Sequence, residues 1–228
     1  MGSTHRNHQF YHLLRKLPVI QQKQHLPLGI AVEPVWKDLW KRERSLDRDL
    51  LQIVADIKFR LQHNGLNVRK KYQNQTSDVL CVHGFDAVED AEHLFWAYPV
   101  ARAAWDFFLP NYRSLLQPEV TWSGVVYLYG MVFQPSALLR FGSHNMLRVF
   151  NVLRCSVLYM LWLHHNDCMM NGTATNTNYV IQRAKAYVRL HLLRMCLADN
   201  TSLRQLSQRW LPNTSTTKST PPPVAHRV

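Results

Sequence analysis

The chain has 228 residues, enough to bury a sizeable core in one or two domains. Hydrophobic residues make up 46% and aromatic residues 11%, which excludes a wholly disordered chain, and only eight glycines disfavour turn-rich β architectures. The formal net charge of +12 divides into +8 over residues 1–75, −4 over 76–140 and +8 over 141–228. Two basic regions around an acidic centre favour a polyanionic partner such as RNA or DNA, although a basic composition also simply keeps a chain soluble.

Targeting and redox signals indicate an intracellular protein. The sequence has no run of about 18 apolar residues, so no membrane partner is expected. The N-terminus lacks the apolar stretch of a signal peptide; its basic, acid-poor start leaves a mitochondrial transit peptide as the minor alternative. Four cysteines at scattered spacings read as reduced thiols: Cys81, Cys155, Cys168 and Cys196.

The first third of the chain is predicted to be a linker followed by a helix. Residues 1–35 read as a basic, proline-punctuated N-terminal linker ahead of a helical domain over 36–211. Apolar residues at offsets of 0, 4, 7, 8, 11 and 15 from Leu46 to Leu61 form one face of a helix. Ser45 is the predicted N-cap, and Asn64 with Gly65 the predicted end.

A short extended pair with Gly84 at its turn is predicted over Asp78–Phe85. A second helix should begin near Glu89, break at Pro99, resume and stop at Pro110. Its apolar stripe is predicted to comprise His93, Trp96, Val100, Ala104 and Phe107.

The remaining chain is predicted to be helical except for one ambiguous segment. Residues 111–145 are rich in β-branched and aromatic residues; a buried helix or irregular element is preferred there over a strand or hairpin. A long core helix is expected over 144–166, a loop over 171–178 and further helices over 179–197 and 202–210. The helix over 179–197 should be basic on its outside, and the tail over 212–228 is low-complexity and disordered.

Cys81, His83 and His93 form the start of a metal-ligand pattern. A structural zinc site needs about four Cys or His ligands, because fewer donors leave a buried divalent cation uncompensated. The nearest fourth candidate in the local sequence is Tyr98, a poor zinc ligand at neutral pH. Cys155, Cys168 or His165 would have to fold back to the motif. The alternative is an ordinary amphipathic helix in which His93 packs beside its aromatic neighbours.

The same stretch resembles the zinc-binding domain that follows the reverse transcriptase in LINE-type (non-LTR) retrotransposon polyproteins. Cys81 matches the first Cys of the family pattern, and Glu89 precedes His93-Leu94-Phe95 at the family's offset. Further matches in register are Pro99, Ala101 and Trp105. Upstream, Ile57–Tyr72 resembles the family's basic helix and turn; downstream, Leu161–Asp167 resembles its Trp-x-x-x-Asn ending. The resemblance covers roughly residues 36–170.

Two ligand positions depart from the family pattern. The second Cys position falls on Gly84, with His83 one residue early, and the last falls on Tyr98. The resemblance therefore implies a zinc cofactor whose binding is reduced or lost, in a fold maintained by helix packing. Leu94, Phe95, Ala101 and Trp105 are the residues expected to supply that packing.

Known catalytic motifs are missing from the sequence. Polymerisation by a reverse transcriptase needs paired aspartates to hold two metal ions, and the chain has no Asp-Asp pair. No nucleophile elbow, phosphate-binding loop or dinucleotide fingerprint occurs either. The His164-His165 pair is expected to sit at a helix C-terminus, where positive charge is favourable, in a structural role. The sequence thus predicts a protein that is not an enzyme and has no small-molecule substrate.

These observations together predict a mainly α, irregular multi-helix domain with a short hairpin at a vestigial zinc knuckle over 78–108. The expected function is a nucleic-acid-binding module derived from a retrotransposon polyprotein. Its phosphate-contacting residues are predicted to be Lys58, Arg60, Arg69, Lys70 and Lys71. The alternative is a helical protein–protein interaction module, or a retrotransposon relic with no selected activity.

Overall fold

The computed structural model describes residues 33–72, 80–81, 86–117, 119–198 and 201–208. Within these ranges the protein is helical, and its only β pairing is two isolated bridges. The elements, in chain order, are α2 (Glu33–Leu46), η3 (Asp47–Asp49), α3 (Gln52–Gln62), η4 (Arg69–Tyr72), η5 (His93–Ala97), α4 (Pro99–Phe108), α5 (Pro110–Arg113), α6 (Trp122–Tyr127), α7 (Pro135–Phe141), α8 (Ser143–Asn171), α9 (Thr177–Ala198) and α10 (Thr201–Ser207). The predicted mainly α class is confirmed.

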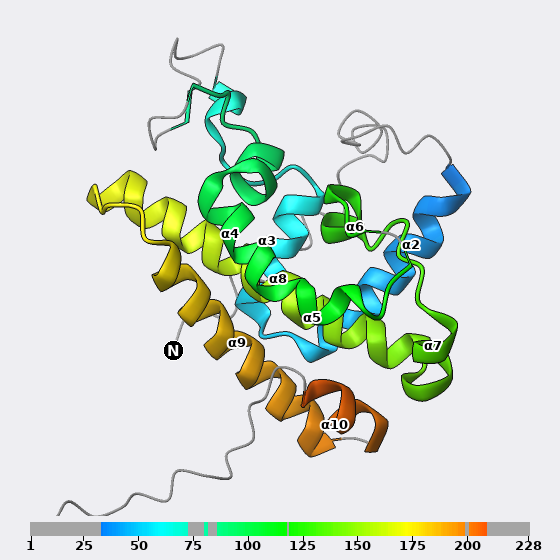
Figure 1. The fold of residues 1–228 in the computed structure, drawn as a ribbon. Helices are drawn as coiled ribbons and strands as arrows, with labels where there is room; N and C mark the ends of the chain where they lie inside the picture. The colour runs from blue at the N-terminus through cyan, green and yellow to red at the C-terminus, as the bar shows by residue number, and fades with distance from the viewer. Residues whose placement is uncertain (1–32, 73–79, 82–85, 118, 199–200, 209–228) are drawn as a thin grey trace, which may run out of the picture.

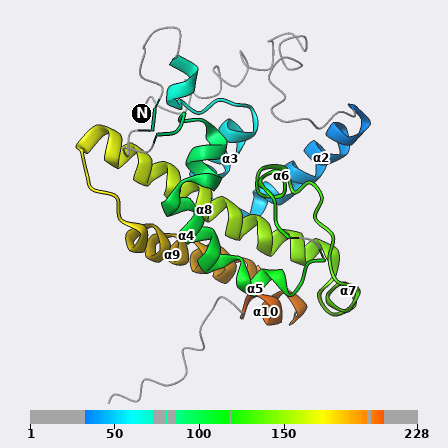
Figure 2. The ribbon, with the colours of Figure 1, turned by 45° about the horizontal axis from the view of Figure 1, so that its top comes forward.

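Helix α8 is the centre of the fold, and α2, α3, α4, α7, α9 and α10 all pack on it (Figure 1). Its residues from Met146 to Leu161 are buried except Leu147, because apolar side chains occupy every side of the helix. Figure 2 shows α9 lying along α8 with α4 beside both. The predicted core helix is therefore confirmed, and it continues one turn beyond residue 166.

Helix α8 also has the length and apolar composition of a membrane span. However, 83% of its most apolar window is buried within the protein, and the core helix of a soluble protein has the same properties.

The predicted helix between Ser45 and Asn64 is in fact two helices. Helix α2 continues past Ser45 to Leu46, and the 3₁₀ turn η3 follows it. Helix α3 begins only at Gln52, and its N-cap residue, Leu51, makes no side-chain capping hydrogen bond. The prediction of Ser45 as N-cap was wrong; its hydroxyl instead donates to the carbonyl of Arg42. Five of the six residues on the predicted apolar face are buried, because both helices pack on the same core, but Ile53 is 54% exposed.

The helix through the motif is broken at Pro99 as predicted. Asp90 caps its start, with its carboxylate accepting from the amide of His93 at 2.8 Å. The turn over His93–Ala97 is a π-helix, closed by a bond from the amide of Tyr98 to the carbonyl of His93. Tyr98 is extended, and Pro99 opens α4 at a position where proline is well tolerated.

The buried stripe of this region differs from the predicted one at both ends, and at its start His93 and Trp96 are only half-buried. Phe107 is 46% exposed, and the neighbouring Phe108 is buried in its place. Val100 and Ala104 follow the π-turn and are buried as predicted, so the difference arises within α4. The buried face continues four residues on from Ala104, at Phe108, rather than three residues on, at Phe107.

The ambiguous segment over 111–145 forms short helices joined by irregular chain, as preferred over a strand. Thr121 caps α6 by accepting from the amide of Gly124 at 3.2 Å. Leu128 ends α6 in the left-handed region at φ 54°, and the single bridge between Leu116 and Phe133 is the segment's only β pairing among the described residues. All five α6 residues other than Ser123 are buried against the core.

A charged network lies inside this helical core. Glu43 of α2 forms ion pairs with Lys58 of α3 and Arg154 of α8, and all three side chains are buried. Arg154 also donates to the carbonyls of Val125 and Val126 at 2.6 and 2.7 Å, which ties α6 to α8. These bonds satisfy most of the guanidinium's donors, as a buried cation requires.

Candidate functional site

The predicted knuckle begins with a short antiparallel contact. Leu80 bridges Val88, and the amide of Cys81 donates to the carbonyl of Ala87 at 2.9 Å. An antiparallel contact is thus present, but its second side lies at Ala87 and Val88, beyond the predicted Asp78–Phe85. Residues 82–85, which include His83 and Gly84, lie outside the described residues.

Cys81 is buried beside the side chain of Tyr98. A second thiol approaches the same tyrosine from the last turns of α8, where Cys168 contacts the ring of His164 at 3.8 Å. Cys81 and Cys168, 87 positions apart in the sequence, thus both lie near Tyr98. No local spacing indicates this proximity, because it depends on the path of α8 through the core.

Tyr98, where the resemblance would place the last zinc ligand, does not have the chemistry of a ligand. Burial raises the pKa of its phenol well above the ordinary value, and the neighbouring thiols of Cys81 and Cys168 raise it further. The phenol therefore stays protonated at neutral pH and offers no anionic ligand to a metal.

His93 lies near Tyr98, with ring centroids 6.1 Å apart. Its Nε2 atom is buried without a hydrogen-bond partner among the described residues. In the part of the chain that the structure describes, no three Cys, His, Asp or Glu side chains are grouped to hold a metal ion. The zinc site of Cys81, His83 and His93 therefore stays a prediction.

The packing residues of the motif lie where the sequence placed them. Leu94, Phe95, Ala101 and Trp105 are all buried, and the indole of Trp105 donates to the carbonyl of Phe95 at 2.7 Å. This bond spans the break at Pro99 and fixes η5 against α4. The prediction that these four residues pack the motif is confirmed.

Glu89, the acidic residue of the motif, is buried in a polar contact between three segments. Its carboxylate accepts from the backbone amide of Arg69 at 3.2 Å and lies 3.6 Å from Nε2 of His165 on α8. Burial lowers the pKa of His165 to about 4, with Arg69 and His164 acting in the same direction. His165 is therefore neutral at pH 7.

The prediction that His164-His165 ends a helix was wrong. Helix α8 continues to Asn171, and both rings are buried within the structure rather than placed at a charged helix end. Burial also lowers the pKa of His164, so neither ring supplies the favourable positive charge expected there.

Lys58 does not belong to an exposed basic face, contrary to the prediction. This side chain is only 2% exposed, and its ammonium group pairs with Glu43 at 3.2 Å and with Asp47. A buried lysine held by two carboxylates has no route to a phosphate without breaking the core. Its place in the interior is the physical reason to remove it from the candidate surface.

The other predicted basic residues are largely paired within the protein. Arg60 pairs with Asp56 at 2.9 Å, and Lys70 with Asp90 at 3.1 Å. Arg69 donates to the carbonyl of Leu80 at 2.9 Å and so helps hold the knuckle. The side chain of Lys71 lies outside the described residues. Nearby acids thus offset most of the positive charge of this segment.

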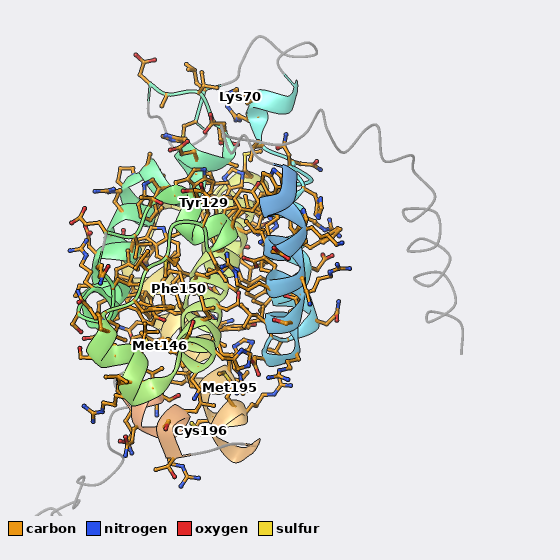
Figure 3. All side chains as sticks on the ribbon, turned by 90° about the vertical axis from the view of Figure 1, so that its right-hand side faces the viewer. Lys70, Tyr129, Met146, Phe150, Met195 and Cys196 are labelled. Carbon is orange, nitrogen blue, oxygen red and sulfur yellow. The ribbon has the colours of Figure 1, made fainter. Side chains whose placement is uncertain are left out.

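Helix α9 presents a different basic surface. Arg183, Arg189 and Arg194 are exposed, Lys185 is half-buried, and α9 contains no acidic residue. None of these four cations forms an ion pair with a carboxylate in the described ranges. Figure 3 places Lys70 at one end of the molecule and Met195 and Cys196, near the end of α9, at the other. The sequence indicated that this helix is basic outside, but not that its charges are unpaired.

Comparisons with known protein families, with characterised proteins and with solved structures give no match.

Proposed function

We propose that the protein is a non-enzymatic nucleic-acid-binding module whose contact surface is the exposed face of α9. The observation that carries the proposal is the unpaired state of Arg183, Lys185, Arg189 and Arg194 among the described residues. A cation that is already paired with a carboxylate must break that ion pair before it can bind a phosphate. These four cations have no such pair to break.

The spacing of the four cations suits an extended polyanion. Arg183 and Arg194 are eleven residues apart, about three helical turns, and so lie in one row along α9. Lys185 and Arg189, four residues apart, form a second row. The rows span about 16 Å along the helix, and no carboxylate of α9 interrupts them.

Salt dependence and charge reversal test this proposal. If four phosphates are contacted, a plot of the logarithm of the binding constant against the logarithm of the salt concentration should have a slope of about −3. The double variant Arg189→Glu, Arg194→Glu should weaken binding of a fluorescein-labelled oligonucleotide at least tenfold in fluorescence anisotropy. Both side chains are exposed, so the fold should be retained.

Arg60→Glu is the matched control, since Arg60 is an exposed arginine of the originally predicted face that already pairs with Asp56. It should have a much smaller effect on affinity. Binding that is absent at low salt, or equally sensitive to Arg60→Glu, would reject the assignment to α9.

A protein–protein interaction module is the second candidate, favoured by two leucines on the same helix. Leu190 and Leu193 are 45% and 50% exposed between the two rows of cations. Exposed leucines beside unpaired cations also suit an amphipathic helix with acidic flanks. Binding of such a peptide in place of nucleic acid would favour this candidate.

A reduced or lost zinc site is the remaining part of the proposal. It is supported by the protonated phenol of Tyr98 at the family's last ligand position. Zinc content of the purified protein, compared with a Cys81→Ala, His93→Ala variant, measures what remains of the site. Equal content near zero in both proteins means that the site is lost, and stoichiometric zinc in the unchanged protein alone rejects the proposed loss.

A further inference from the structure

We infer that the α4–α9 surface binds single-stranded nucleic acid, with the rings of Phe107 and Tyr179 as stacking platforms for bases. This inference rests on the proposed function and specifies the class of nucleic acid. It is drawn from two exposed aromatic rings that each lie next to a cation of α9.

Phe107 joins α4 to the cationic surface. Its ring is 46% exposed, and the ammonium of Lys185 lies 5.6 Å from the ring centroid. Helices α4 and α9 are in direct contact, so the exposed part of Phe107 faces the solvent next to the row of Lys185 and Arg189. A base stacked on this ring would place its phosphate near an unpaired cation.

Tyr179 provides the second ring near the start of α9. It is 42% exposed, and the guanidinium of Arg183 lies 5.9 Å from its centroid. Asn176 anchors this end of the helix, because its side-chain oxygen accepts from the amide of Tyr179 at 2.9 Å. The ring is thus carried on a capped helix rather than on a loop.

The exposed apolar side chains of this surface favour binding of single-stranded over double-stranded nucleic acid. A duplex keeps its base faces stacked internally and presents phosphates, to which exposed rings and leucines contribute nothing. An unpaired strand offers one π face per base, and each base–ring contact is worth roughly five- to 150-fold in affinity. Tyr179, Ala186, Leu190 and Leu193 follow one stripe about 21 Å long between the cations.

The experiment compares binding of a 20-mer oligothymidylate and a 20-base-pair duplex to the full chain. Charge density alone favours the duplex, so tighter binding of the single strand is the expected and distinctive result. Phe107→Leu and Tyr179→Leu keep an apolar helix-forming residue but remove the π face. Each should weaken oligothymidylate binding about tenfold and leave duplex binding unchanged.

Phe59→Leu is the control, since Phe59 is a 50% exposed ring on α3, outside this surface. It should change neither affinity, and Tyr179→Phe should retain single-strand binding. Circular dichroism and the thermal midpoint verify that each variant is folded.

The outcomes separate this inference from the proposed function. Salt-sensitive binding of both probes, with no effect of the ring substitutions, overturns the stacking platforms but retains nucleic-acid binding. Absence of binding to both probes overturns both proposals. Binding of an acidic amphipathic peptide without binding of either oligonucleotide likewise overturns both, and favours a protein partner.

Discussion

Arg154 of α8 and Glu43 of α2 form an ion pair in which both side chains are closed off from solvent, at 0% and 2% exposure. Burial alone would raise the pKa of Glu43, but Arg154 and Lys58 more than offset it, and the net pKa is lowered. The carboxylate is therefore ionised at neutral pH, and three helices meet around it.

Removing one member of this network should be far more costly than removing the pair. Arg154→Met leaves Glu43 buried with only Lys58 to compensate it, so we expect a loss of about 3–5 kcal/mol in the free energy of unfolding. Adding Glu43→Leu to Arg154→Met should restore part of that loss, because the buried charge is removed. Urea denaturation of the two single variants and the double variant measures the coupling; strictly additive losses would contradict it.

Stability should fall as the pH is lowered from about 6.5 to about 4. Because the folded pKa of His165 is about 4, the unfolded chain binds more protons than the folded chain throughout this window. The contribution of His165 to the free energy of unfolding is therefore complete above pH 6.5. It is lost on acidification, and the loss is at most about 3 kcal/mol. Burial likewise lowers the pKa of His63, His164 and His191, which adds to the same trend.

Chemical denaturation at pH 7.5 and pH 4.5 measures this dependence. His165→Gln should flatten the profile but leave the residual slope of the other histidines. A slope unchanged by the substitution would show that His165 does not contribute.

Tyr98→Cys should increase zinc binding if the motif is a degenerate knuckle. The substitution places a thiol at the family's last ligand position, beside Cys81, where the phenol is protonated and inert. Loss of the buried ring costs stability, so the variant should be more stable with zinc than without it. Metal content and the thermal midpoint with and without a chelator are the measurements, with Tyr98→Cys, Cys81→Ala as control.

The exposure of Phe107, a residue of the predicted buried stripe, gives a fourth prediction. Phe95→Ala, at 0% exposure, should lower the free energy of unfolding by about 3–5 kcal/mol. Phe107→Ala, at 46% exposure, should cost about 1 kcal/mol or less. Equal losses from the two substitutions would show that Phe107 is packed as the uniform helical period predicted.

Features encoded locally were predictable from the sequence. Pro99 broke its helix where expected, because proline cannot continue the preceding turn. The apolar residues around α8 revealed the core helix without any knowledge of its neighbours. Leu94, Phe95 and Trp105 were predicted to pack from a resemblance to a family pattern, and the structure buries all three.

Features that depend on distant partners were not predictable. The sequence shows a lysine at position 58 but not that Glu43 and Asp47 hold it in the interior. The two carboxylates are 15 and 11 residues away, too far to reach Lys58 along one continuous helix. Cys168 reaches Tyr98 only because α8 crosses the whole domain. The break between α2 and α3 likewise involves a residue distant in the sequence. Asp49, in the 3₁₀ turn between the two helices, forms an ion pair with Arg148 of α8 at 2.8 Å.

The central position of α8 has a consequence for synthesis of the protein. The helices from α2 to α7 are made before it, yet α2, α3, α4 and α7 pack on it in the finished fold. Their apolar faces therefore have no complete core to join until the ribosome has released Ser143–Asn171. At about 5–20 residues per second, α8 alone takes seconds to make, and during that interval the apolar faces of the earlier helices lack the surface on which they finally pack.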